Sequence, residues 1–216
     1  MAIFRLEGVL LGRPARLAAA YLAANAQGLG ERLGRLGGLL LGTPLALGAQ
    51  LGLTEEAARS VWAPLAGMGE DRLRELSAEY AERFVEEGIG EVGRRLVREA
   101  RRAGFGIVLL SEHLDWMVEG LAERLGVERL WANRLEIKRG RATGRLLEPV
   151  IGGSPPLGWL RAEAERQGWD LHRSRAYGAR AADGLLLGAV GEPCAVRPDP
   201  LLRRMAIEHD WAVVDA

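Results

Sequence analysis

The sequence predicts an α/β protein with a doubly wound, Rossmann-like parallel sheet core and an inserted α-helical cap. A short apolar run at residues 2–6, bounded by Gly8, is typical of a buried strand. Residues 13–103 carry only helical patterns, and after them short apolar runs alternate with helical segments, which favours a parallel sheet. We therefore assign residues 1–12 and 104–216 to the core and 13–103 to the cap.

The individual elements follow from caps, periodicity and apolar runs. Thr54 followed by two glutamates is typical of a helix start, because acids in the first turn suit the helix dipole. We expect helices over 13–33, 54–62, 71–84 and 90–102 in the cap, and over 111–125, 155–167, 182–190 and 199–208 in the core. We expect the remaining strands over 106–110, 130–137, 142–147, 174–178, 193–196 and 211–214.

The composition fits a folded domain and narrows the function classes. Of the 216 residues, 48% are hydrophobic and 27% charged, so the chain can bury a full core. Acidic and basic residues number 29 each, which argues against a nucleic-acid partner. Cys194 is the only cysteine, so no internal disulfide forms. His113, His172 and His209 lack metal-ligand spacing, and we assign none of them a catalytic role.

One segment, residues 36–53, is uncharged and consists mostly of leucine, glycine and alanine. Its length approaches that of a membrane span, but glycines and Pro44 interrupt it. We therefore favour short helices packed inside the cap, and keep binding of a lipid or a protein partner through this segment as an alternative. The N-terminus enters a strand without a basic and apolar leader, so we expect a cytoplasmic protein.

Four stretches occur in the order of the motifs of a known family. The first strand, Ala2–Leu10, is similar to Phe-Asp-x-Asp-Gly-Thr, and Gly106–Ser111 is similar to a strand ending in a phosphate-binding serine. Trp159-Leu160 resembles the sequence that follows the lysine of the third motif, and Tyr177–Asp183 resembles the fourth motif, Tyr-Gly-Asp-Ser-x-x-Asp. The chain thus resembles the phosphoserine-phosphatase-like branch of the haloacid dehalogenase-like superfamily over nearly its whole length. The resemblance implies a Mg²⁺-dependent phosphomonoester hydrolase whose cap selects the substrate.

The chemical positions of these motifs depart from the family. Arg5 stands where the resemblance places the nucleophilic aspartate, and Glu7 stands at the acid–base aspartate. A guanidinium is always protonated and offers no lone pair to phosphorus. Pro156 stands at the lysine that neutralises the phosphoryl group, and Ala179 stands at a metal-binding aspartate. Catalysis by the family mechanism therefore lacks its main groups.

The same departures change the charge of the site. The resemblance implies four aspartates, one lysine and one Mg²⁺ in the family, whereas Arg5, Arg180, Glu7 and Asp183 here cancel one another. Because buried charges need partners, we expect Arg5 to meet Glu7, Asp183 or both. Mg²⁺ prefers carboxylate and water oxygens, so we predict no metal site although the family uses this ion.

Three functions remain open at this point. We favour a non-catalytic pseudophosphatase that serves as a binding, regulatory or structural protein. Arg5, Arg180 and Ser111, which we place at a helix start, form its predicted anion pocket for a small phosphate-bearing ligand. The second hypothesis is an active phosphomonoester hydrolase with unusual catalytic residues. The third is the lipid- or partner-binding module described above.

Overall fold

The computed structural model describes residues 1–25, 55–152 and 157–215. Thr54, segment 36–53 and Pro156 lie outside the described residues. In chain order, the strands are β1 (Ala2–Arg5), β2 (Ile107–Leu114), β3 (Arg129–Lys138), β4 (Arg141–Leu147), β5 (Arg175–Gly178), β6 (Glu192–Val196) and β7 (Ala212–Val214). The α-helices are α1 (Ala15–Ala24), α4 (Glu55–Trp62), α5 (Glu70–Tyr80), α6 (Glu91–Arg102), α7 (Asp115–Arg124), α8 (Leu157–Gln167), α9 (Gly184–Leu187) and α10 (Pro200–Glu208). A π-helical stretch, Ala81–Glu86, extends α5, and 3₁₀ turns occupy Ala63–Leu65, Leu171–Arg173 and Ala181–Asp183.

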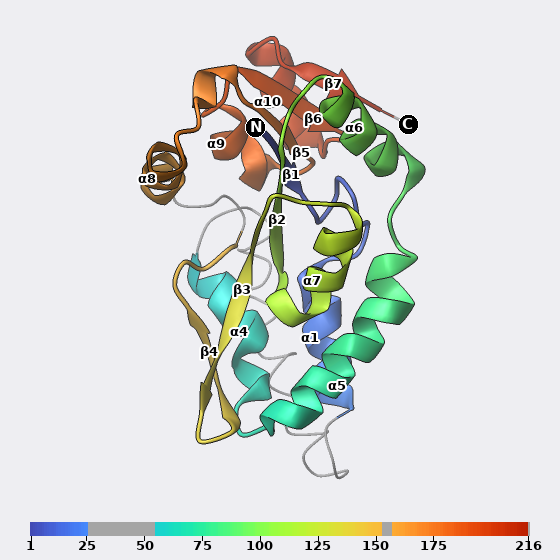
Figure 1. The fold of residues 1–216 in the computed structure, drawn as a ribbon, viewed down its shortest axis with the longest axis vertical. Coiled ribbons are helices and arrows are strands. Elements are labelled where there is room, and N and C mark those ends of the chain that lie inside the picture. Colours follow the sequence, from blue (N-terminus) through green and yellow to red (C-terminus); the bar gives the residue numbers. More distant parts are fainter. Residues whose placement is uncertain (26–54, 153–156, 216) are drawn as a thin grey trace.

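The strands form one sheet in the order β4-β3-β2-β1-β5-β6-β7 (Figure 1). All neighbours pair in parallel except β3 and β4, which form an antiparallel hairpin. Strand β1 lies in the middle, with β2 on one side and β5 on the other, so the strand order reverses beside it. The predicted α/β class is confirmed, and ligands of such sheets bind where the order reverses.

Strand β1 is central because all its side chains are apolar except the last. Each of its four residues is fully buried, and Phe4 and Ile3 point to opposite faces, into two separate hydrophobic clusters. The Phe4 ring stacks on that of Tyr177 from β5, with centroids 4.1 Å apart. Because both faces of β1 are buried in this way, its register is fixed, and with it the position of Arg5 at its carboxyl end.

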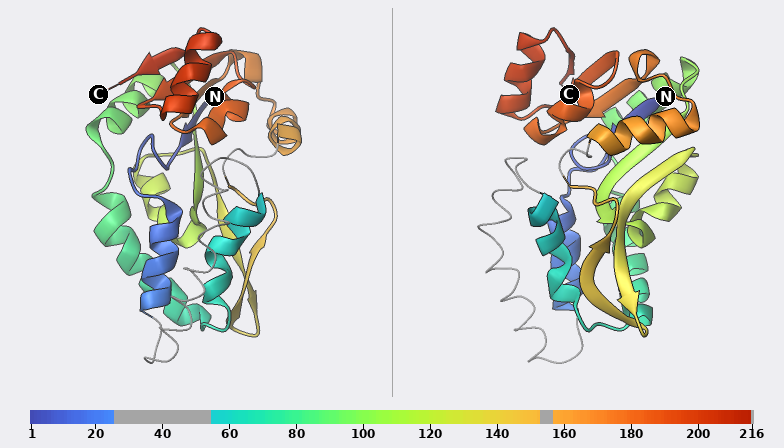
Figure 2. Two further views of the ribbon diagram at one scale, coloured as in Figure 1. Left: turned by 180° about the vertical axis from the view of Figure 1, so that it is seen from behind. Right: turned by 90° about the vertical axis from the view of Figure 1, so that its left-hand side faces the viewer.

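Helices α1, α4 and α5 lie at the opposite end of the molecule from α9 and α10 (Figures 1 and 2). The β3–β4 hairpin reaches from the sheet into this end. The Gly67 amide donates to the Ala142 carbonyl at 2.8 Å, and the Ala142 amide donates to the Met68 carbonyl at 2.8 Å. A hairpin assigned to the core is therefore bonded to residues assigned to the cap, while the boundaries at 12/13 and 103/104 stay predictions.

Several predicted element boundaries are wrong. The helix expected over 13–33 ends at Ala24, and the helix expected over 182–190 ends at Leu187. Ser111 does not begin a helix, because β2 continues to Leu114 and α7 begins at Asp115. Pairing between β2 and β3 shifts register between Leu110 and Leu114, and such an irregularity lets a strand turn successive side chains toward one site. The pairing of Leu114 with Asn133 beyond the irregularity is what keeps the chain extended past Ser111.

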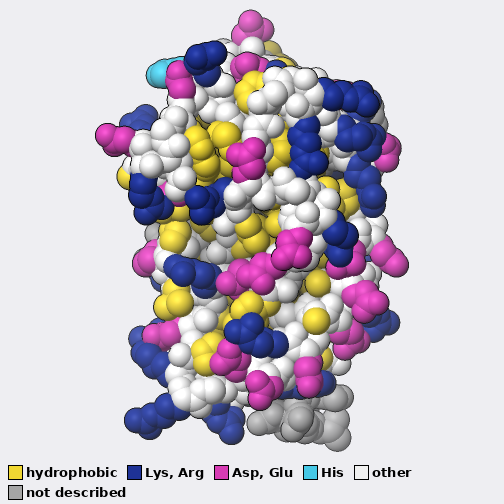
Figure 3. Space-filling view, in the orientation of Figure 1, with side chains coloured by type: hydrophobic (Ala, Val, Ile, Leu, Met, Phe, Trp, Pro, Cys, Tyr) yellow, Lys and Arg dark blue, Asp and Glu magenta, His cyan; other side chains and the backbone are white. Residues whose placement is uncertain are grey.

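The surface carries charges of both signs. On the face shown in Figure 3, acidic and basic side chains are interspersed over most of the area. No helix among the described residues has the length and apolar character needed to cross a membrane.

Candidate functional site: an arginine–carboxylate cluster

The predicted site residues come together at the carboxyl ends of three parallel strands. Arg5 is the last residue of β1 and Glu7 follows this strand, Ser111 lies in β2, and Arg180 and Asp183 follow β5. Parallel strands place their carboxyl ends at one edge of the sheet, which explains how distant sequence positions meet. Of the predicted positions, only Pro156 lies outside the described residues.

Arg5 is fully buried and lies among carboxylates. Its Nη2 donates to Glu112 Oε1 at 2.6 Å. Its Nε lies 3.0 Å from Asp183 Oδ1, close enough for an ion pair although the N–H is not directed at that oxygen. A third carboxylate oxygen, Glu7 Oε2, is 3.8 Å from Nη2. The expected pairing of Arg5 with Glu7 and Asp183 is therefore present.

Asp183 also holds the loop that follows β5. Its Oδ2 accepts hydrogen bonds from the amides of Ala179, at 2.8 Å, and Arg180, at 3.0 Å. The loop passes so close to Gly8 that a Cβ at Gly8 would lie 2.6 Å from that of Ala179. Gly8 has a φ of 88°, which only glycine adopts readily. The loops after β1 and β5 are therefore packed directly on each other.

Glu7 is the most heavily bonded carboxylate of the site. Its Oε1 accepts from the Ser111 hydroxyl at 2.8 Å and the Glu112 amide at 2.9 Å, and lies 2.7 Å from Nδ1 of His113. Burial raises the pKa of Glu7, but the hydrogen bond and charge of His113, with the charge of Arg5, outweigh burial and bring the pKa to about 2. Glu7 is therefore held ionised inside the protein.

Arg180 forms the outer part of the cluster. Its Nη2 donates to the same Glu112 oxygen that Arg5 contacts, also at 2.6 Å. The Arg180 and Glu112 side chains are 27% and 18% exposed, whereas Arg5 and Asp183 are sealed from solvent. Burial lowers the pKa of Arg180, but the Glu112 and Asp183 carboxylates more than compensate and raise it. The cluster thus meets solvent at Glu112 and Arg180.

Two members of the cluster, Glu112 and His113, are not among the site residues predicted from the sequence. The sequence predicts a helix from Ser111, which would place Glu112 and His113 on that helix. The available signal was the run Ser-Glu-His at the end of an apolar strand, which lies beside the polar end of β1 in parallel register. Ser111 itself does not present its hydroxyl to an outside anion, because the hydroxyl binds Glu7.

The donor set does not fit Mg²⁺. A guanidinium occupies the space beside Asp183, and Ala179 presents a methyl group where the ion would need an oxygen. Within residues 1–25, 55–152 and 157–215, no group of three or more acidic, histidine or cysteine side chains is arranged to hold a metal ion.

Several buried polar atoms of the site have no hydrogen-bond partner in the described part of the chain. They are Arg5 Nε and Nη1, Glu7 Oε2, His113 Nε2, Arg180 Nε, Asp183 Oδ1 and, from α5, Tyr80 Oη. The Tyr80 and His113 rings lie 6.0 Å apart. Buried polar groups are usually satisfied by protein, water or ligand, so the cluster has bonding capacity beyond its internal pairs.

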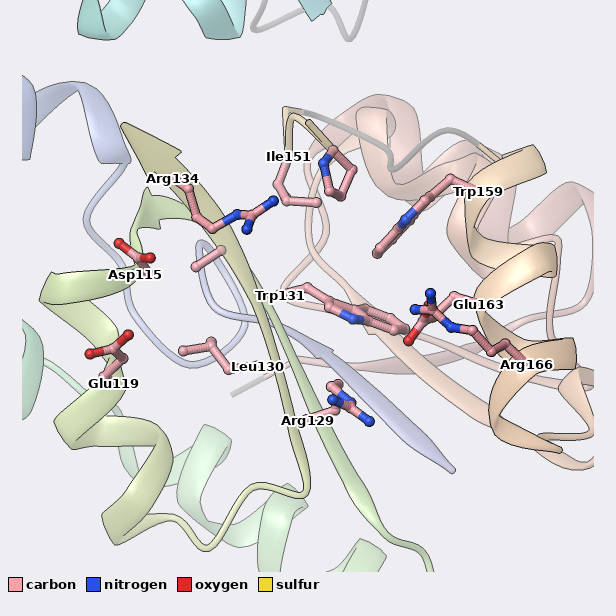
Figure 4. A pocket seen from close by; sticks show the side chains of 12 residues that line it. Asp115, Glu119, Arg129, Leu130, Trp131, Arg134, Ile151, Trp159, Glu163 and Arg166 are labelled. Carbon is pink, nitrogen blue, oxygen red and sulfur yellow. The ribbon is translucent and has the colours of Figure 1, made fainter. Parts of the chain in front are cut away.

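A separate hollow of about 570 Å³ lies beside β3 (Figure 4). Asp115 and Glu119 of α7 line one side, and Trp159 of α8 lines the other together with Trp131 of β3. The two indole rings meet edge to face with centroids 4.8 Å apart. None of the sequence-predicted site residues that the structure describes lines this hollow, and its charges are of both signs.

Comparisons with known proteins place these observations in a family. The sequence-family model for haloacid dehalogenase-like hydrolases matches residues 14–187. The chain is 32% identical over 150 residues to an inhibition of morphological differentiation protein of Streptomyces azureus, covering 69% of this chain and 54% of that protein. It is 28% identical over 157 residues to a phosphoserine phosphatase of Mycobacterium tuberculosis, covering 73% and 51%. The chain spans about half the length of these curated relatives.

Solved structures share the fold. A Bordetella pertussis protein of unknown function superposes with a TM-score of 0.81 at 26% identity, covering 100% of this chain and 97% of that one. A substrate-bound phosphoserine phosphatase superposes with a TM-score of 0.71 at 20% identity, covering 99% and 91%. With the family model matching most of its length, this chain belongs to the haloacid dehalogenase-like hydrolase family, in the phosphoserine-phosphatase-like branch.

Proposed function

We propose that this chain is a non-catalytic member of its family, a pseudophosphatase that serves as a binding, regulatory or structural protein. The observation that supports this most directly is Arg5, which stands at the family's nucleophile position and lies fully buried against Asp183. A guanidinium cannot attack phosphorus. Its three nearby carboxylates hold it in place, so the position serves an ion cluster rather than a reaction.

We further propose that the chain binds no Mg²⁺ at this site. Phosphoryl transfer relies on cations that neutralise the phosphoryl oxygens and position the reactants. In this chain Arg5 and Arg180 supply the positive charge, and they direct it at internal carboxylates. A metal ion entering the cluster would meet two guanidiniums and would have to displace one of them from its partners.

The competing hypothesis is an active phosphatase that uses Glu7 as nucleophile, since carboxylates do form covalent intermediates. One Glu7 oxygen is engaged by Ser111, Glu112 and His113. The residue is only 2% exposed, and its pKa of about 2 makes it a weakly basic carboxylate. These features favour a structural role for Glu7. The alternative role of segment 36–53 in lipid or partner binding, like the cytoplasmic location, rests on sequence alone.

The deciding experiment is a phosphatase assay of the purified chain with Mg²⁺ and a generic aryl phosphate. We expect no turnover above that of Glu7→Ala, the matched variant that controls for contaminating phosphatases. Mg²⁺-dependent turnover that disappears in Glu7→Ala would overturn the proposal in favour of the active enzyme.

A second experiment tests the mapping of positions. Arg5→Asp, Ala179→Asp, Arg180→Ser and Pro156→Lys are introduced together, and Mg²⁺ binding is measured by titration calorimetry. We expect the folded variant to bind Mg²⁺ and the unsubstituted chain to bind none. A folded variant that fails to bind the ion would show that these positions do not correspond to the family's metal site.

A further inference from the structure

The Glu112 carboxylate is held in the way that proteins hold an anionic ligand. A single oxygen, Oε1, accepts from Arg5 Nη2 and from Arg180 Nη2, each at 2.6 Å. Arg5 is the last residue of β1 and Arg180 lies in the loop after β5, so the two arginines converge on this atom from two neighbouring strands. Converging guanidiniums are the groups that recognise carboxylates and phosphates.

The two arginines retain donors that Glu112 does not use. Arg5 Nη1 is fully buried, and neither it nor Arg180 Nε has an acceptor in residues 1–25, 55–152 or 157–215. A carboxylate that offers one oxygen to both guanidiniums leaves these N–H groups unsatisfied. A tetrahedral oxyanion has more acceptor oxygens, so it can bond to the donors that Glu112 contacts and to others besides.

Exposure shows how an outside anion could reach the pair. Glu112 and Arg180 are the partly exposed members of the cluster, whereas Arg5, Glu7 and Asp183 are buried. Rotation of the Glu112 side chain into solvent would hydrate its own charge. It would leave Arg5 and Arg180 facing only two carboxylates, Glu7 and Asp183, so an arriving anion would restore the lost negative charge.

We propose that Arg5 and Arg180 form an oxyanion site for a phosphate group, and that Glu112 is its resident internal ligand, displaced when the phosphate binds. This inference rests on the proposed function, because a metal-loaded phosphatase site would not contain the arginine pair. Glu112 thereby sets the affinity of the site by competing from within the chain, where its effective concentration is high.

The test compares phosphate binding by the unsubstituted chain and by Glu112→Ala, without metal and with a chelator present, using calorimetry and thermal unfolding. We expect Glu112→Ala to bind inorganic phosphate at least about tenfold more tightly, because the internal competitor is gone. At a phosphate concentration 100 times Kd, its unfolding midpoint should rise by roughly 5–10 °C. Binding of an aryl phosphate is measured in parallel. If the site takes phosphomonoesters, the aryl phosphate should bind as tightly as inorganic phosphate. If the site takes only free phosphate, the aryl phosphate should not bind.

Matched variants keep the outcome specific. Glu208→Ala removes an exposed carboxylate that pairs with Arg204, so it makes the same change in net charge far from the cluster and should leave phosphate binding unchanged. Glu112→Gln keeps the shape of the side chain without its charge, and should also gain affinity, which covers a failure of Glu112→Ala to fold. Adding Arg180→Gln to Glu112→Ala should abolish the gain.

The inference is overturned if neither Glu112 variant binds phosphate more tightly than the unsubstituted chain. It is equally overturned if Glu208→Ala gains the same affinity or if the gain survives Arg180→Gln. The phosphatase assay, run on the same samples, separates the two proposals. Turnover by the unsubstituted chain contradicts the non-catalytic role, whereas absent turnover with no gain in phosphate affinity contradicts only the site described here.

Discussion

The ion pairs inside the cluster and those on the helix surfaces use the same residue types with different consequences. On α10, Arg204 Nε lies 2.7 Å from Glu208 Oε1, and the two side chains are 76% and 52% exposed. In the cluster, Arg5 Nε lies 3.0 Å from Asp183 Oδ1, and both side chains are fully buried. Water solvates the surface charges whether or not they pair, but buried charges depend wholly on their partners. We therefore expect the stability of the fold to depend on the buried ion pairs of the cluster, and to change little when a surface ion pair is removed.

The largest effect that could break this comparison is expected at Arg5. Arg5→Met keeps a long side chain but leaves the buried Asp183 without its ion-pair partner and removes one of the two arginine contacts of Glu112. We expect the free energy of unfolding to fall by about 3–5 kcal/mol. Urea unfolding followed by circular dichroism measures it, and an unchanged midpoint would contradict the structural importance of the cluster.

Acid should weaken the cluster through Glu7. Its folded pKa, about 2, lies below the ordinary glutamate value of 4.5, so its contribution to stability is fully present above pH 4.5 and is lost as the pH falls toward 2. We expect this loss to reach about 3 kcal/mol over that window. Unfolding free energies measured between pH 6 and pH 2.5 should fall less steeply in Glu7→Gln than in the unsubstituted chain. Parallel curves would show that Glu7 does not carry the acid dependence.

Substitution at the rim of the cluster should have an intermediate effect. Arg180→Gln removes one of the two guanidiniums that contact Glu112, but both side chains reach solvent and can be rehydrated. We expect a loss of about 1–2 kcal/mol in the free energy of unfolding. A loss as large as that of Arg5→Met would mean that the rim is as dependent on its partners as the buried centre.

The smallest effect is expected on the surface. Glu208→Ala removes the partner of Arg204 from an exposed helix, and alanine is a good helix former. Its urea midpoint should not differ measurably from that of the unsubstituted chain. A clear decrease would remove the contrast between the two kinds of ion pair.

The sequence predicted the sheet well because its signals are local. Apolar runs such as residues 2–4 and 107–110 predict buried strands, and Asp199 is correctly predicted as the cap of α10, where it accepts from the Leu202 amide at 2.7 Å. The pairing of Arg5 was also predictable, since a buried charge needs a partner.

The run Ser-Glu-His indicates polar groups at the end of a strand, but the convergence of all three on one cluster depends on an irregularity in strand pairing that no local pattern encodes. The register shift between Leu110 and Leu114 allows Ser111, Glu112 and His113 all to contribute to the cluster. In a regular strand alternate side chains point to opposite faces, and in a helix these three would diverge.

The junction between the β3–β4 hairpin and the helical end has a consequence for how the molecule opens. Backbone hydrogen bonds join Gly67 and Met68 to Ala142, and the Glu70 amide to the Gly140 carbonyl at 2.9 Å. These amides can exchange their protons with solvent only if the helices separate from the hairpin. Their hydrogen-exchange rates should therefore match those of the central strands. The helical layer and the sheet would then unfold as one cooperative unit, and a shortened chain without the helices would not fold independently.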